Sequence, residues 1–521
     1  MKARLLHRDR DFDRSSQLPW NEAALTTDLE LTILVEAMSR GDAVVSAVAR
    51  SAILTSFGND IDTIRYRQEV LRDCLDNADV VREMYAIVAA ASEREIDVGR
   101  SSLSRNPDWV LRWATATIDS HLGALERLRH VAEARRQSFT SAGLGGLFSS
   151  LTAELDADYC AAVRHHLGRL KFRDGMLLGA ALGKGNKGGD YILLEPPAAG
   201  GLGWAARLPW LARLIGRFRR QQTGAFGFTI DPFDETGVKA LASLRDRGVA
   251  LVAGALGESV EHIRGFLVAL RSELAFYVGC VNLHERLRRI GIPTCVPVPA
   301  APESSELAFD GLCEPALALT IGRVVVSNDV RADDKDLILV TGANQGGKST
   351  FLRSVGLAQL MMQSGMFVTA DAFRASLVDG IATHFRREEA ADLDSGKLDD
   401  ELARMSDIVD HVTPHMMIMF NESFAATNER EGSEIARQIM SPLIKRRLRL
   451  LAVTHFYELA RSFAEEGEDK VLFLRAERRQ DGSRSFRMVP AEPSPTGYGE
   501  DLYREIFSDG KPAPNAAAPN L

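Results

Sequence analysis

The sequence predicts a multidomain protein in which a helical region with a small β-containing insertion precedes an α/β domain. Apolar residues recur with helical spacing from about residue 22 to 170 and again from about 236 to 290. Between 171 and 235, glycines punctuate short apolar runs, which indicates strands and hairpins inserted into the helical region. From about 307 to 510, apolar runs of strand length alternate with helical segments, a pattern typical of an α/β domain.

Length and composition are those of an ordinary soluble globular protein. The 521 residues suffice for about two to four domains, with 45% hydrophobic and 26% charged residues. A formal net charge of −8 means that any contact with nucleic acid must come from a local basic patch. The five cysteines form no C-x-x-C pair, which argues against a zinc site or a disulfide framework. There is no apolar signal core at the N-terminus and no apolar run of membrane-spanning length, so we expect a cytoplasmic location.

Changes of composition place the boundaries between these parts. Residues 1–21 are expected to form an N-terminal arm, and residues 22–300 the helical region with its glycine-rich, partly basic insertion at 171–235. A proline-rich stretch leads into the α/β domain at 301–510, and the tail at 511–521 is expected to be disordered. Within the α/β domain, strands are expected near 322–327, 337–341, 416–420, 449–453 and 471–475.

Two segments of the insertion have more than one interpretation. The loop from Gly183 to Gly189 carries two lysines among its glycines, and it could touch phosphate or be a bare flexible turn. From Arg207 to Arg220, arginines alternate with apolar residues and no acidic residue interrupts them. An amphipathic basic helix of this kind suits DNA, an anionic membrane or an acidic partner, but it also suits a solvated helix face over a core.

The most informative stretch of the chain runs from Thr341 to Thr350. It fits the phosphate-binding pattern G-x-x-x-x-G-K-[ST], follows the apolar run 337–340 and leads into a helical pattern. Glycines let backbone N–H groups curl around phosphate oxygens, and the helix N-terminus adds partial positive charge. A simple glycine-rich turn would not explain why Lys348 and Ser349 stand at the positions that the pattern requires. We therefore predict a nucleotide site here.

Each residue type in this loop has an expected role. Lys348 would reach the β and γ phosphates of ATP, Ser349 would bind Mg²⁺, and Thr350 would support the α phosphate. The residues expected to contact the nucleotide are Gly342, Ala343, Asn344, Gln345, Gly346, Gly347, Lys348, Ser349 and Thr350.

A second element lies at the end of the apolar run 416–420, which continues into Asn421 and Glu422. The usual pair at this place is Asp-Glu, in which the Asp holds the Mg²⁺ shell and the Glu orients and deprotonates the attacking water. Asn421 can hydrogen-bond a metal-bound water but does not offset the charge of Mg²⁺, so we expect weaker Mg²⁺ coupling and slow hydrolysis. Glu422 remains available as the base. The alternative is a simple capped strand end.

A third element is the apolar run 450–453, which ends in Thr454 and His455. A histidine N–H at the end of a strand in such a domain can hydrogen-bond the terminal phosphate or the attacking water. We therefore predict that His455 senses the γ-phosphate and, with Glu422 and Lys348, belongs to the catalytic group.

Together these three elements resemble the ATPase domain of the MutS family of DNA mismatch-repair proteins. The family loop reads G-P-N-M-G-G-K-S-T, and here it reads G-A-N-Q-G-G-K-S-T at 342–350. Residues 359–370 look like the family's apolar helix and G-x-[FY]-V-P-A turn, with Thr369 in place of the proline. Residues 454–459 are similar to its T-H-[YF]-x-E-L switch, and 494–499 resemble its late S-Y-G segment. The likeness covers about 305–510.

The upstream region resembles the family less closely. Residues 54–57 and 64–70 look like the start of its helical core and lever region. The mismatch-reading domain with its F-x-E wedge is missing, since the F-x-E at 456–458 belongs to the switch strand, and no nuclease-like domain is visible after 510. The resemblance implies a helical core/lever region followed by an α/β P-loop (ABC-type) ATPase domain.

Family members work as dimers in which a signature segment of one subunit completes the ATP site of the other. The resemblance places that segment at 394–402, where Ser395-Gly396-Lys397 matches S-G-[RK] but Leu398-Asp399-Asp400 replaces S-T-F. Two acids there would repel phosphate unless a metal or a lysine intervenes. An aromatic residue upstream of the loop stacks on adenine in the family, whereas 324–326 is Val-Val-Val here, so we expect weaker base stacking.

The resemblance thus implies an ATP- and Mg²⁺-binding homodimer, joined through its ATPase domains, that acts as a clamp on DNA in repair or recombination without reading mismatches. ATP binding would close the dimer, and slow hydrolysis at Glu422 would reopen it. The alternative is an ATP-switched scaffold with little hydrolysis that regulates a protein partner, which Asn421 and the acidic signature segment favour. A third interpretation, expected least, is a membrane- or RNA-associated ATPase that uses residues 207–220.

Overall fold

The computed structural model describes residues 1–99, 106–172, 176–182, 188–194, 234–387, 396–465, 469–479 and 483–493. These residues fall into two compact units, each described by itself. The first unit contains residues 86–136 and 148–271, and the second contains 2–85, 137–147 and the chain from 272 onward.

The first unit is helical and carries one β-hairpin. Its helices include α6 (Pro107–Arg135), α8 (Ala157–Arg169) and parts of α5 (Ala78–Gly99), α7 (Ala142–Glu154) and α10 (Glu235–Ile290). The hairpin pairs β1 (Leu177–Leu182) with β2 (Gly188–Leu194) in antiparallel register. The helical periodicity and the strands predicted for the insertion are therefore confirmed where the structure describes them. The loop at 183–187 and the arginine-rich segment at 207–220 lie outside the described residues.

Sequence signals at the start of α6 explain where this helix begins. Asn106 accepts a hydrogen bond from the N–H of Asp108 at 2.8 Å, and Pro107 occupies the first helical position, where its missing N–H costs nothing. The buried face of α6 then packs Ala114 and Ile118 against Val260 of α10.

The helix α10 is the one described helix that is long and apolar enough to cross a membrane by length and composition. However, 83% of its apolar window is buried inside the structure. A core helix passes the same test, so the composition of α10 is weak evidence for a membrane span.

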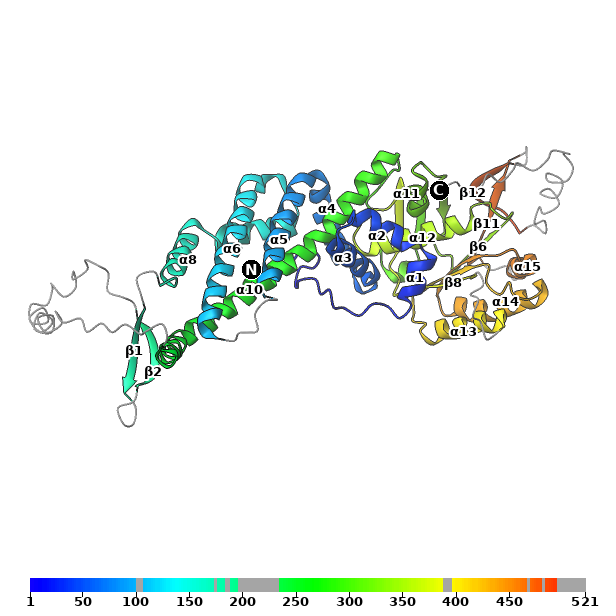
Figure 1. The fold of residues 1–521 in the computed structure, drawn as a ribbon. Helices are drawn as coiled ribbons and strands as arrows, with labels where there is room; N and C mark the ends of the chain where they lie inside the picture. Colours follow the sequence, from blue (N-terminus) through cyan, green and yellow to red (C-terminus); the bar gives the residue numbers. More distant parts are fainter. Residues whose placement is uncertain are drawn as a thin grey trace, which may run out of the picture. The chain divides into compact units, whose positions relative to one another are not determined.

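The helices of the second unit begin close to the N-terminus. They are α1 (Glu22–Asp28), α2 (Leu31–Ser39), α3 (Ala43–Leu54) and α4 (Ile61–Asp76), together with the first part of α5 and the last part of α10 (Figure 1). The arm before α1 is anchored, because the buried Glu273 of α10 accepts the N–H groups of Leu6 at 3.1 Å and Phe12 at 2.7 Å. Tyr277 donates its hydroxyl to the carbonyl of Leu5 at 2.7 Å.

A six-stranded sheet with the order β12-β11-β6-β10-β9-β8 forms the centre of the α/β part. Its strands are β6 (Leu337–Thr341), β8 (Ile381–Phe385), β9 (Met417–Asn421), β10 (Arg449–Val453), β11 (Val471–Arg478) and β12 (Arg484–Pro490). All neighbouring pairs are parallel except β11 and β12. The central strands read as continuous apolar runs because helices cover both of their faces.

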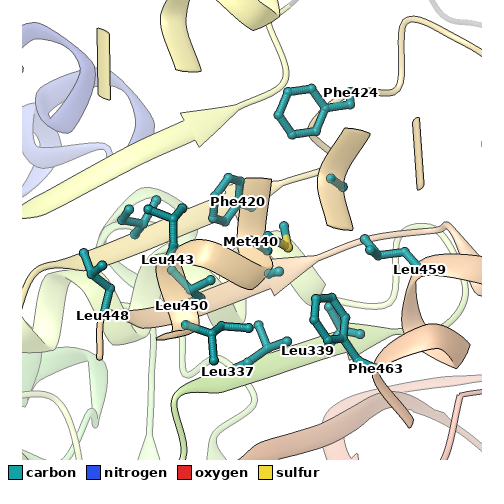
Figure 2. Close-up of a cluster of buried hydrophobic side chains, with 14 of the residues drawn as sticks. Leu337, Leu339, Phe420, Phe424, Met440, Leu443, Leu448, Leu450, Leu459 and Phe463 are labelled. Atoms are coloured by element: carbon teal, nitrogen blue, oxygen red, sulfur yellow. The ribbon is translucent and has the colours of Figure 1, made fainter. Parts of the chain in front are cut away.

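The helices of the α/β part are α11 (Pro315–Ile321), α12 (Lys348–Gln363), α13 (Lys397–Asp410), α14 (Glu429–Lys445) and α15 (Tyr457–Glu465). On one face of the sheet, alternate strand residues such as Leu339 and Phe420 pack with Met440 of α14 and Phe463 of α15 in one hydrophobic cluster (Figure 2). The helix α12 contacts β9 and β10, where Gly356 approaches Met419 so closely that an added Cβ would lie 3.0 Å from its sulfur.

A second, four-stranded sheet has the order β3-β7-β4-β5. Its strands are β3 (Val298–Ala300), β4 (Leu307–Leu312), β5 (Asn328–Arg331) and β7 (Ala372–Ser376). This sheet is mixed, with β3 and β7 parallel and the other pairs antiparallel. The sequence did not reveal it.

Four of the five expected strands of the α/β part are confirmed, and the strand expected at 322–327 is wrong. Gly322 ends α11 in a left-handed conformation with φ +67°, and the strand of this region begins only at Asn328. The three valines at 324–326 suggested a strand, but Val324 and Val326 are exposed by 56% and 42% and line a cavity.

Candidate nucleotide-binding site

The glycine-rich loop lies between the end of β6 and the start of α12, as the sequence predicts. Gly342 and Gly347 have φ values of +110° and +88°, which side chains disfavour. A Cβ at Gly342 would lie 3.0 Å from the backbone nitrogen of Ala476, and one at Gly346 would lie 2.8 Å from the Cβ of Ala476. The neighbouring strand β11 therefore leaves room only for glycine at both positions.

The side chain of Lys348 is buried with 4% exposure and folds back over the loop. Its Nζ donates to the carbonyl oxygens of Gly342 at 2.9 Å and Ala343 at 3.1 Å. Burial lowers the pKa of Lys348, and the nearby Glu422 opposes this effect.

Ser349 and Asn421 are brought together from separate elements. The Ser349 hydroxyl, in the first turn of α12, donates to Oδ1 of Asn421, at the end of β9, at 2.9 Å. These are the two residues that the sequence predicts as holders of Mg²⁺. Among the residues that the structure describes, no group of three His, Cys, Asp or Glu side chains could hold a metal by itself.

Glu422 lies in a strained turn directly after β9. Glu422 and Phe424 both have left-handed backbones, with φ values of +52° and +62°. Such a conformation costs about 1–2 kcal/mol per residue and persists where the surroundings enforce it, often at functional sites. The N–H of Glu422 donates to the carbonyl of Val453 at 2.9 Å. Its carboxylate lies 3.8 Å from the guanidinium of the exposed Arg386, which adds little.

His455 follows β10, the strand between β6 and β9 in the sheet. The loop after β6, Glu422 after β9 and His455 therefore share the carboxyl edge of the parallel strands, where α/β proteins bind ligands. His455 is exposed and its ring packs edge-on against Phe456, with ring centres 4.5 Å apart. It is outside the residues that line the adjoining cavity.

A cavity of about 650 Å³ adjoins the loop. The residues from Gln345 to Phe351 and Glu422 line it, as do the valines at 324–326. Two further side chains of its lining, Glu314 and Phe486, were not predicted from the sequence. The volume is typical of a small-molecule pocket.

Phe486 is an aromatic side chain in the lining of this cavity. It lies on β12 with 46% exposure, and an added Cβ at Gly347 would be 3.5 Å from its Cβ. The expectation of weak base stacking considered only the segment upstream of the loop. No local signal marks Phe486, because only the pairing of β12 with β11 and of β11 with β6 brings it to the cavity.

Glu314 is buried with 2% exposure and caps the N-terminus of α11 by accepting the N–H groups of Ala316 and Leu317. Burial raises the pKa of Glu314 to about 7, an effect that these N–H groups oppose and the nearby Glu30 reinforces. The cavity therefore contains a carboxyl group that titrates near neutral pH.

The signature segment expected at 394–402 is described from Gly396 onward. Asp399 and Asp400 lie in the first turn of α13, where acidic side chains interact favourably with the partial positive charge of the helix N-terminus. Asp400 also pairs with Arg404, whose Nε lies 3.1 Å from its Oδ2. The two acids thus have a structural role in the helix, while Asp394 and Ser395 and the segment at 494–499 lie outside the described residues.

Comparison with known proteins agrees with this architecture. Residues 59–290 match the family model of the MutS2 N-terminal domain, and residues 338–504 match that of MutS domain V. The curated relatives include the "Endonuclease MutS2" proteins of Streptococcus pneumoniae serotype 19F (strain G54) and of the strains Taiwan19F-14 and Hungary19A-6, each 28% identical over 221 residues. The alignment covers 42% of this chain and 28% of each relative's length.

The fold and the two domain matches define a class: a multidomain protein with a helical N-terminal region and a C-terminal part of ATPase type. The chain belongs to the MutS family, and its two matches are to the MutS2 N-terminal domain and to MutS domain V, neither of which is a mismatch-recognition domain. The resemblance inferred from the phosphate loop and the switch motif is confirmed.

Proposed function

We propose that this protein is an ATPase of the MutS type that hydrolyses ATP slowly and acts as a dimeric clamp on DNA. The observation that carries the proposal is the convergence of Lys348, the Ser349–Asn421 pair and Glu422 at the carboxyl edge of one parallel sheet, beside a cavity of about 650 Å³. Residues 22–300 serve as the core and lever region and residues 301–510 as the ATPase domain. The location is cytoplasmic.

The loop from Gly342 to Thr350 binds the phosphates of ATP. The left-handed glycines expose backbone N–H groups at the N-terminus of α12, which favours anions. The ammonium of Lys348, which the loop carbonyls now hold in place, exchanges these partners for oxygens of the β and γ phosphates. Its burial strengthens that contact, because the charge interacts in a medium of lower dielectric constant than water.

Ser349, at the start of α12, and Asn421, at the end of β9, fit a Mg²⁺ ion together with ATP. Ser349 offers a hydroxyl oxygen, and Asn421 offers an amide oxygen through a bound water. When bound, the ion neutralises charge on the phosphates. Because Asn421 carries no charge, it holds the ion's water shell less firmly than an aspartate, and slow turnover follows.

Glu422 acts as the base that orients and deprotonates the attacking water. The strained turn fixes its backbone, and Arg386 is too exposed to neutralise it. His455 at the same sheet edge donates an N–H to the terminal phosphate or the water. The cavity residues do not include His455, so its contact requires the γ-phosphate to extend toward the end of β10.

Phe486→Ala is expected to weaken ATP binding about tenfold, because stacking of a base on an aromatic ring contributes about 1–3 kcal/mol. The dissociation constant of a fluorescent ATP analogue measures this. Phe486→Tyr keeps the ring and is the matched control. Equal affinities of the alanine and tyrosine variants would place the base elsewhere in the cavity.

ATP affinity is expected to fall about threefold between pH 6 and pH 8 through Glu314. Its pKa is raised to about 7, so the group is neutral below that pH and negatively charged above it, where it repels the polyphosphate. The terminal phosphate of ATP titrates in the same range, so the reference at each pH is Glu314→Gln. The dissociation constant of the wild type divided by that of Glu314→Gln should rise with pH. A constant ratio contradicts the role given to Glu314.

The test of the proposed function is the ATPase rate with and without duplex, branched and single-stranded DNA. A DNA clamp predicts turnover that changes with one of these ligands and binding to DNA that weakens as salt rises. Dimerisation that depends on ATP supports the homodimer joined through its ATPase domains, and it is measured by light scattering with the same samples.

A second candidate function is an ATP-switched scaffold that regulates a protein partner. Two features favour it. The neutral Asn421 weakens hydrolysis, and the acidic first turn of α13 opposes the approach of phosphate. ATP-dependent dimerisation without turnover and without DNA affinity would support the scaffold and reject the DNA clamp.

A further inference from the structure

A buried histidine, His384, contacts the two residues that follow Glu422. It lies on β8, which pairs with β9, and its side chain has no solvent exposure (0%). Its Nε2 lies 2.9 Å from the main-chain oxygen of Glu401 in α13 and must donate, because a carbonyl only accepts. Its Nδ1 lies 2.8 Å from the hydroxyl of Ser423, the residue after Glu422.

Ser423 contacts His384 at a second atom. The Ser423 hydroxyl also lies 2.6 Å from the main-chain oxygen of His384, so it has two acceptors within reach for one proton. Burial lowers the pKa of His384 to about 4, so the ring is neutral near pH 7 with its proton on Nε2. Ser423 is itself buried with 7% exposure, and water does not compete for these bonds.

The residue after Ser423 is fixed by the same histidine. The ring of Phe424 stacks on His384 with ring centres 5.1 Å apart and an angle of 23°. The N–H of Phe424 hydrogen-bonds the Glu401 carboxylate, which lowers the pKa of that group against the larger effect of burial. Gly432 closes the other side, where an added Cβ would lie 2.8 Å from the carbonyl oxygen of Phe424.

We propose that His384 is a positioning residue for ATP hydrolysis: through Ser423 and Phe424 it holds Glu422 in its left-handed conformation and couples that conformation to α13. The inference rests on the proposed function, which gives Glu422 the role of base. His384 is outside the cavity lining, so it acts through Glu422 and not on the nucleotide. A shift of α13 at Glu401 would pull on the histidine and release the turn.

The first test compares His384→Phe and Ser423→Ala with the full-length wild type. The phenylalanine keeps a ring against Phe424 but has no nitrogen atoms, and the alanine removes a single hydroxyl. Both should lower kcat about 10- to 100-fold, the loss expected when a reacting group is misplaced by about an ångström. The dissociation constant of ATP should stay within about twofold, because neither residue belongs to the phosphate loop.

The matched control is His411→Phe. His411 directly follows α13, the helix that His384 contacts, and it is half-exposed and stacks on Trp20 with ring centres 4.2 Å apart. The same histidine-to-phenylalanine substitution is thus made away from Glu422. This variant should keep the wild-type kcat. A purely structural His384 would lower ATP affinity, melting temperature and kcat together in His384→Phe and leave the kcat of Ser423→Ala unchanged, and that result overturns the proposal.

The second test does not depend on hydrolysis. The N–H of Glu422 is bonded to Val453, so hydrogen exchange of a peptide covering 417–424 reports the order of the turn. Exchange in this peptide should become about tenfold faster in Ser423→Ala and His384→Phe, and unchanged exchange rejects the positioning role. If the wild type has no turnover, the proposed function fails, while the exchange rates still decide whether His384 holds Glu422.

Discussion

Glu422→Gln is expected to stop ATP hydrolysis while ATP binding persists. Glutamine has nearly the same shape as glutamate but cannot take a proton from water, and a general base contributes about 10²–10⁴-fold to the rate. The backbone bond from Glu422 to Val453 does not depend on the side chain, so the turn should stay in place. The measurement is kcat together with the dissociation constant of ATP.

The control for this substitution is Glu434→Gln, which changes an exposed glutamate of α14 that pairs with Arg437 and Gln438. It should hydrolyse ATP as fast as the wild type. If Glu422→Gln also keeps the wild-type rate, Glu422 is not the base, and the end of β9 serves structure only. If neither protein has any turnover while ATP binds, the scaffold becomes the better account.

Lys348→Met is expected to weaken ATP binding at least about 30-fold. Removing one partner of a buried charge pair costs about 2–5 kcal/mol, and each 1.4 kcal/mol corresponds to tenfold in affinity. Methionine fills the space of the buried lysine stem, so the fold should be kept better than with alanine. The substitution also removes the bonds from Nζ to Gly342 and Ala343, which loosens the loop.

The dissociation constant of ATP and the melting temperature should be measured on the same samples, with Lys335→Met as the control. Lys335 is half-buried and its Nζ contacts the main chain at Asp469, away from the cavity lining. An unchanged ATP affinity in Lys348→Met would remove the phosphate loop from the proposed site. A fall in the melting temperature without a fall in ATP affinity would mean that Lys348 stabilises the loop but does not bind the nucleotide.

The parts of the site that the sequence predicted are those with local signatures. Lys348 and Ser349 follow a strand and begin a helix within ten residues of sequence, so their neighbourhood is fixed by short-range geometry. Asn421 and Glu422 end an apolar run, and parallel strands bring their carboxyl ends to one edge. That edge is why three motifs spread over more than a hundred residues could be assigned to one site.

The parts that the sequence missed depend on contacts between distant segments. Phe486 reaches the cavity through the order of strands in the sheet, and Glu314 through the start of a short helix. The valines at 324–326 have strong strand propensity, yet they line the cavity, because propensity does not say which surface a segment will cover. His384 gave no signal at all, since a lone histidine in an apolar strand carries no pattern.

The sequence by itself determined the family, the position of the glycine-rich loop between a strand and a helix, and the order of helical and α/β parts, because these depend on periodicity and on motifs within one turn or strand. Only the tertiary structure decided which side chains surround the cavity and what holds Glu422. Those outcomes depend on strand order and on burial, which place His384 between Ser423 and α13 and raise the pKa of Glu314 to about 7. Neither strand order nor burial is encoded in any short stretch of the chain.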